Sequence, residues 1–80
     1  MIGLIAADDH QAKQCLKKHP VFKKDAVRVV NSLSTAQQPY EEIWLYGTLS
    51  ACQGEQWSWL RWARQTTREQ LHKEPLIKFL

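Results

Sequence analysis

The chain has few cysteines and no long apolar run. Its two cysteines, Cys15 and Cys52, lack the spacing of a metal-binding or redox pair. No stretch approaches the roughly 20 apolar residues that span a bilayer. The apolar start lacks the basic n-region of a signal peptide and is interrupted by Asp8 and Asp9. We therefore expect a cytoplasmic protein whose thiols are reduced and packed in the core, with a disulfide as the alternative.

The sequence also lacks the common motifs of enzymes and cofactor sites. It contains no GxGxxG, Walker, HExxH or GxSxG string. Its histidines, His10, His19 and His72, do not have the spacing of metal ligands. We therefore expect no cofactor, no metal and no enzymatic activity.

The composition is that of a small globular protein. Apolar residues make up 44% of the 80 residues and charged residues 24%, so the chain is expected to fold as a single domain over 1–80. This length lies near the lower limit for one hydrophobic core. The net charge of +3 is a mild basic excess, which permits contacts with nucleic acid or acidic proteins without requiring them.

Short apolar runs alternate with helical patterns along the chain. Possible N-caps precede the helical patterns at Asp8, Ser34 and Ser50, each with a glutamine three residues later. Pro20 and Pro75 mark the ends of two helices, and Pro39 limits the middle one to a turn or two. The predicted strands are 1–7, 26–33 and 43–49, and the predicted longer helices are about 9–19 and 50–73.

This order predicts an α/β fold with a small, mainly parallel sheet of three or four strands and helices packed on it. The wholly apolar first run favours a central strand, which gives the strand order 2-1-3, and the order 3-2-1 remains open. The apolar tail 76–80 is either a fourth, edge strand or a packed terminal segment.

Polar residues follow the first and third predicted strands. In parallel sheets, ligands bind beyond the carboxyl ends of the strands, where Asp8, Asp9 and Ser50 are expected to lie. Two carboxylates suit a divalent cation, and a helix beginning at Ser50 suits a phosphate. The simpler interpretation is that the aspartates cap a helix and interact with its dipole.

The last predicted helix carries three tryptophans and three arginines. At about 100° per residue, one arc forms its core face. That arc contains Cys52, Trp59, Leu60, Ala63, Thr67 and Leu71. One border of the arc carries Trp57, Arg61, Arg64 and Arg68, and Trp62 lies on the other border.

This border pattern is typical of a binding surface. Arg61 lies one turn from Trp57, where it can stack on the indole, and the guanidiniums match carboxylate or phosphate oxygens. The alternative is a solvated face whose arginine stems cover a partly exposed tryptophan. A second basic cluster is predicted from the sequence around the end of the first helix. It contains Lys13, Lys17, Lys18, Lys23 and Lys24.

Three functions follow from these residues. The first hypothesis is a binding or regulatory module that engages a protein partner, or a second copy of itself, through Trp57, Arg61, Trp62, Arg64 and Arg68. The second is a nucleic-acid-binding protein that uses the same arginines and the lysine cluster, and it gains support only if the two basic areas merge. The third is a small metal- or phosphate-dependent enzyme built on Asp8, Asp9 and Ser50. We expect no contact with membranes.

Overall fold

The protein folds as a parallel sheet flanked by helices, which confirms the predicted α/β class. The computed structural model describes residues 1–18, 27–47 and 54–80. Its strands are β1 (Ile2–Ala6), β2 (Val27–Val29), β3 (Glu42–Tyr46) and β4 (Leu76–Phe79). Its helices are α1 (Asp9–Lys18), α2 (Leu33–Ala36) and α3 (Gly54–Leu71). None of the helices in these ranges is long and apolar enough to cross a membrane.

The strand order is β2-β1-β3-β4, and every neighbouring pair is parallel. The apolar β1 is therefore a central strand, as the order 2-1-3 requires. The tail of the chain forms a fourth strand, because Leu76 to Phe79 pair with Glu42 to Leu45. Together, these pairings settle both points that the sequence left open.

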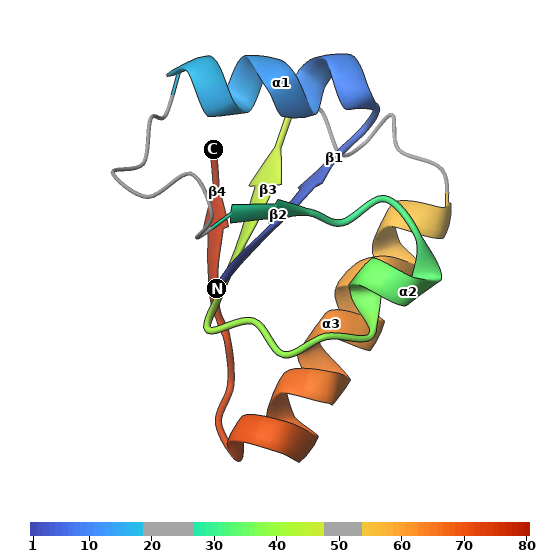
Figure 1. Ribbon diagram of the computed structural model, residues 1–80, viewed down its shortest axis with the longest axis vertical. Helices are drawn as coiled ribbons and strands as arrows, with labels where there is room; N and C mark the ends of the chain where they lie inside the picture. Colours follow the sequence, from blue (N-terminus) through green and yellow to red (C-terminus); the bar gives the residue numbers. More distant parts are fainter. Residues whose placement is uncertain (19–26, 48–53) are drawn as a thin grey trace.

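Two apolar layers lie on opposite faces of the sheet. Ile5, Ile43 and Leu45 face α2 and α3, and their core includes Ala36 and Ala63. Alternate strand residues such as Leu4 and Trp44 face α1, where they pack with Ala12 and Cys15. Figure 1 shows α1 on one side of the sheet and α2 and α3 on the other. This division fixes which basic side chains share a surface.

The N-caps agree with the sequence at one helix and differ at another. Asp8 caps α1, because its Oδ1 accepts a hydrogen bond from the backbone N–H of Gln11 at 2.8 Å. At α2 the predicted cap Ser34 is wrong. Ser32 is the N-cap, and its side chain and that of Thr35 form a reciprocal capping box. The third predicted cap, at Ser50, lies outside the described residues.

The second strand is shorter than predicted. It ends at Val29, whereas the apolar run extends to Leu33, the first residue of α2. The capping box begins at Ser32 and satisfies free N–H groups of a helix start, so the chain enters α2 there and does not continue as a strand. The β-branched pattern alone gave no sign of this break.

A buried tyrosine connects β1, α2 and α3. Tyr40 is fully buried, and its hydroxyl donates a hydrogen bond to the backbone carbonyl of Thr35. Its backbone N–H donates to Thr67 Oγ1 of α3 at 2.8 Å. Its ring lies against Gly3, where a Cβ would come within 3.0 Å of Tyr40 Cγ. Thr67 also donates to the Ala63 carbonyl at 2.7 Å, so one hydroxyl holds α3 against the loop before β3.

Candidate functional site

Helix α3 presents its small residues to the core and its large polar residues to the borders. Ala63 and Thr67 are fully buried, and Trp59 and Leu60 pack against the same core, as predicted. The placement of Leu71 on the core face is wrong, because this side chain is 37% exposed. The end of α3 extends past the amino ends of the strands, so no sheet lies beneath it (Figure 1). Cys52 lies outside the described residues.

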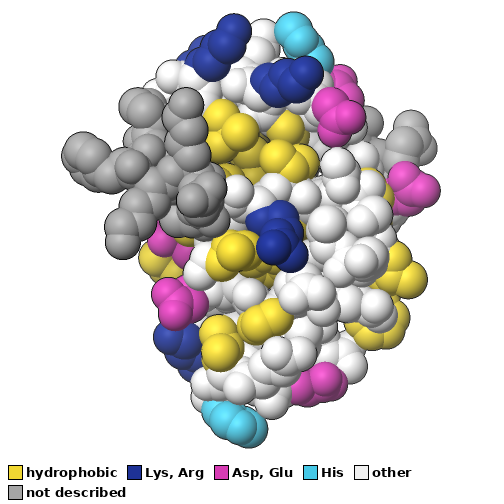
Figure 2. Space-filling model, in the orientation of Figure 1, with side chains coloured by type: hydrophobic (Ala, Val, Ile, Leu, Met, Phe, Trp, Pro, Cys, Tyr) yellow, Lys and Arg dark blue, Asp and Glu magenta, His cyan; other side chains and the backbone are white. Residues whose placement is uncertain are grey.

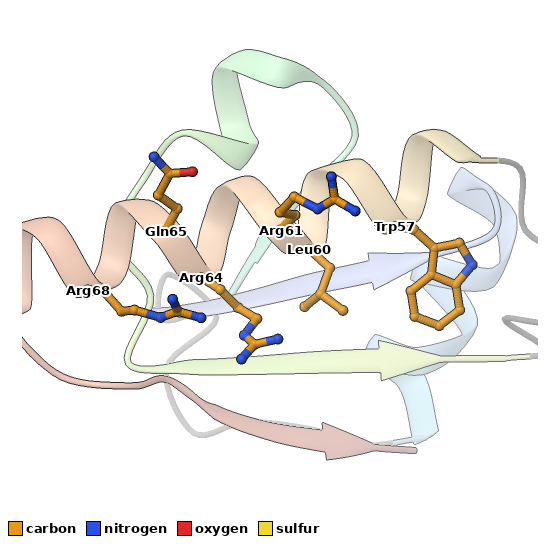
Figure 3. Close-up of a pocket in the computed structure, with 6 residues that line it drawn as sticks. All are labelled: Trp57, Leu60, Arg61, Arg64, Gln65 and Arg68. Atoms are coloured by element: carbon orange, nitrogen blue, oxygen red, sulfur yellow. The ribbon is translucent and has the colours of Figure 1, made fainter.

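One border of α3 is hollowed into a groove with a volume of about 330 Å³. We call this the α3 groove, and its lining residues are Trp57, Leu60, Arg61, Arg64, Gln65 and Arg68. The structure thus brings together four of the five residues predicted for partner binding. Figure 3 shows Trp57, Leu60 and Arg64 projecting from α3 on the side of β3 and β4. The predicted stacking of Arg61 on Trp57 stays a prediction.

The arginines of the groove already hold one carboxylate. Glu74 follows α3 and pairs with Arg68, whose Nε lies 2.5 Å from Glu74 Oε1. It also pairs with Arg64 across 3.7 Å, from Nη2 to Oε2. Among the described residues, Arg61 forms no ion pair, and the buried Nε of Arg64 has no hydrogen-bond acceptor. The groove therefore has donors left for an acidic ligand.

Both border tryptophans are open to solvent, but they lie at different places. Trp57 is 47% exposed and forms one wall of the α3 groove. Trp62 is 37% exposed and does not belong to the groove lining. The two indoles therefore do not share the α3 groove, in agreement with their predicted positions on opposite borders of the helix.

The described part of the lysine cluster lies on the other side of the sheet. Lys13, Lys17 and Lys18 are exposed on α1, which covers the face opposite α3. Figure 2 shows basic side chains at the top of the molecule, over the position of α1. Lys23 and Lys24 lie outside the described residues. The described lysines and the arginines of the groove are thus two separate basic areas.

A second hollow of about 350 Å³ lies at the carboxyl ends of β1 and β2. The enzyme hypothesis placed its site beyond the first and third strands instead, and residues 48–53, which follow the third strand, lie outside the described residues. Asp8 and Asp9 line the hollow together with Glu55 and Gln56. Asp8 serves as the cap of α1, and Ser50 lies outside the described residues. Within residues 1–18, 27–47 and 54–80, no three His, Cys, Asp or Glu side chains lie close enough to hold a metal ion.

Sequence reasoning missed two polar residues beside these hollows. Gln56 is 9% exposed and donates from Nε2 to the Ala7 carbonyl at 3.3 Å, while its buried Oε1 has no hydrogen-bond partner among the residues that the structure describes. Gln56 lies seven residues, or about two helical turns, before Ala63, and this spacing predicts that its side chain faces the core. Glu74 lies beyond the end of α3, and no periodic pattern could have paired it with the arginines.

Cys15 is a core residue, as predicted. It is fully buried and has a free thiol. Burial raises the pKa of this thiol, because the thiolate is poorly solvated among apolar side chains. A thiol of this kind is a weak nucleophile at neutral pH.

We compared the chain with protein-family models, with curated proteins and with solved structures, and found no significant match in any of them. The chemistry of the described side chains is therefore the basis for a functional proposal.

Proposed function

We propose that this protein is a non-enzymatic binding module that takes an acidic segment of a protein partner in the α3 groove. The observation that carries the proposal is that an exposed indole and three guanidiniums line the same hollow. Tryptophan and arginine are the residue types most enriched at the centres of protein interfaces. The lining offers apolar surface and cationic donors, and its residues include no serine, threonine, cysteine, histidine or carboxylate.

The contacts of Glu74 support a carboxylate as the bound group. This residue occupies Arg64 and Arg68 from within the chain, in the way that a partner carboxylate would. The side chains of these three residues are 41–58% exposed, and exposed ion pairs contribute at most about 1 kcal/mol. Displacing Glu74 therefore costs little. An incoming carboxylate can also pair with Arg61, which lines the groove and forms no ion pair among the described residues.

The position of the lysines favours a protein partner over nucleic acid. A nucleic-acid strand is held by a continuous track of positive charge along its phosphates. The described lysines of α1 and the arginines of α3 face opposite sides of the sheet, so one strand cannot follow both. A short acidic segment needs only the groove.

The test is fluorescence anisotropy at low salt with a short labelled peptide of alternating glutamate and leucine. A labelled single-stranded oligonucleotide of equal charge serves as the competing probe. We expect the peptide to bind more tightly, and Arg64→Gln to weaken its binding about tenfold, the equivalent of one charge-assisted hydrogen bond. Glu74→Gln is expected to strengthen binding, because it removes the internal competitor.

Lys17→Gln is the matched control, because it removes the same charge on the other side of the sheet. Tighter binding of the oligonucleotide would favour nucleic acid as the partner. No binding of the peptide, or equal losses in Arg64→Gln and Lys17→Gln, would refute the role of the groove.

A further inference from the structure

The last strand, β4, and the residue after it carry large apolar side chains that are exposed to solvent, whereas the apolar side chains of the neighbouring strand β3 are buried. Phe79 is 76% exposed, Leu76 57% and Leu80 37%. Among the strands that the structure describes, β4 ends the sheet beside β3, and Figure 3 shows it as the outermost strand. Natural edge strands are usually protected by charge, proline or a bulge, because an open edge can pair with another strand.

The backbone groups on this edge can be assigned from the pairing with β3. The N–H of Leu76 donates to the Glu41 carbonyl at 3.0 Å, and that of Leu80 donates to the Leu45 carbonyl at 2.9 Å. In a strand, successive residues direct their backbone groups to opposite sides. The N–H and C=O groups of Ile77 and Phe79 therefore point away from β3, toward the open edge.

We propose that two copies of this chain pair through β4, antiparallel and centred on Lys78. In this register Ile77 lies opposite Phe79 of the second copy, and the outward N–H and C=O groups of both residues bond to each other. Both side chains lie on the α3 side of the sheet, because Ile77 packs against the core on that side. On the α1 side, Leu76 lies opposite Leu80 of the second copy. The dimer is a single eight-stranded sheet.

The charge at the centre of this interface is already neutralised. In the proposed register Lys78 faces its own copy, and facing like charges destabilise a pair of strands. However, Lys78 Nζ lies 2.8 Å from Glu42 Oε1 on the neighbouring strand. The indole Nε1 of Trp44 donates to the same oxygen at 2.7 Å, so Glu42 is held in place. The hydrogen bond from Lys78 is the main cause that lowers the pKa of Glu42, and the hydrogen bond from Trp44 adds to it. Glu42 is therefore charged near neutral pH.

Other pairings satisfy fewer groups. A register centred on Ile77 sets Phe79 against Pro75, which has no N–H to donate. The opposite edge of the sheet is β2, which has three residues and carries the exposed Arg28, so it is protected in the usual way. The fit of the β4 edge to itself, in hydrogen bonds and in apolar side chains, favours a second copy over a foreign strand.

The test is the molar mass of the full chain in solution, measured by sedimentation over a range of concentrations. We expect a reversible dimer whose dissociation constant rises at least about tenfold in Phe79→Pro. This substitution removes an outward N–H and no hydrogen bond to β3, so the fold is kept, and circular dichroism verifies this. Phe79→Thr retains the N–H and is the matched control, with a smaller expected loss. Glu42→Gln is expected to weaken the dimer severalfold, because it leaves two lysines facing each other.

Three results would overturn the proposal. One is a chain that stays monomeric up to about 1 mM. Another is a dimer that is indifferent to Phe79→Pro but dissociates in Trp62→Ala, which would place the contact on α3. The third is a monomer that binds an unrelated extended peptide at β4, which would identify the edge as a docking site for other chains. The dimer is built on β4 and not on the α3 groove. Arg64→Gln is therefore expected to leave the dimer intact.

Discussion

The hydroxyl of Thr67 is the single polar group whose removal should most clearly weaken the attachment of α3. It accepts from the Tyr40 N–H at 2.8 Å and donates to the Ala63 carbonyl at 2.7 Å, and both Thr67 and Tyr40 are fully buried. Thr67→Val retains the shape of the side chain and removes the oxygen. The Tyr40 N–H then loses its acceptor without gaining access to water. A buried donor left in this state costs about 1–3 kcal/mol.

A second variant separates this hydrogen bond from packing. Thr67→Ser retains the hydroxyl and loses one buried methyl, at a cost of about 1 kcal/mol. We therefore expect the native chain to be the most stable and Thr67→Val the least. The whole chain should have a free energy of unfolding of about 4–12 kcal/mol, given its 80 residues. A loss of about 2 kcal/mol is a large part of that total.

Urea unfolding followed by tryptophan fluorescence measures the difference. With a slope near 1 kcal/mol per molar urea, Thr67→Val should lower the midpoint by about 2 M and Thr67→Ser by about 1 M. Protein concentration must be equal in all samples, because self-association would raise the midpoint. A Thr67→Val midpoint equal to or above that of Thr67→Ser would refute the reasoning, since packing alone would then account for both losses.

Two further predictions concern the surroundings of Tyr40. Burial raises the pKa of its phenol, so the unfolded chain loses this proton at a lower pH than the folded chain, and stability should fall as the pH rises above about 10. Tyr40→Phe should lack this pH dependence and should be about 1 kcal/mol less stable at neutral pH. Unfolding measurements at pH 7 to 11 check both points. If the stability of the native chain and of Tyr40→Phe changed with pH in the same way, the reasoning would be contradicted. Gly3→Ala places a Cβ 3.0 Å from the Tyr40 ring and should destabilise by about 1–3 kcal/mol in thermal unfolding. Gly54→Ala, with nothing within 4 Å of the new Cβ, should be neutral or stabilising by up to about 1 kcal/mol, so equal effects of the two would exclude a steric cause.

Local patterns predicted much of the fold correctly. An apolar run without alternation, from Ile2 to Ala6, indicated a strand covered on both faces, and β1 is the central strand of a parallel sheet. Asp8 with Gln11 predicted the start of α1, because capping depends on residues three apart. Trp57 and the arginines of α3 were assigned to one border by helical periodicity, and they line one groove.

The errors occurred where the end of an element depends on the rest of the molecule. Ser34 matched a capping pattern, but Ser32 lies at the point where the chain leaves the sheet, and the helix begins there. Leu71 lies at nearly the same angle as Leu60 on the helical wheel, and Leu60 packs against the core. However, the wheel does not tell how far the sheet extends beneath the helix, and Leu71 is exposed where the strands end.

The sequence by itself determined the class of fold, the buried face of α3 and the border on which its arginines lie, because these follow from residues close together in the chain. Only the tertiary structure decided that Glu74 occupies two of those arginines, that the lysines of α1 face away from them, and that Phe79 lies on an open edge. Each of these depends on the strand order and on the path of the chain between distant elements. Periodicity along the sequence carries information about neighbours within a few residues. The contacts that shape both proposed surfaces, however, join segments that are distant in the sequence or separated by a turn.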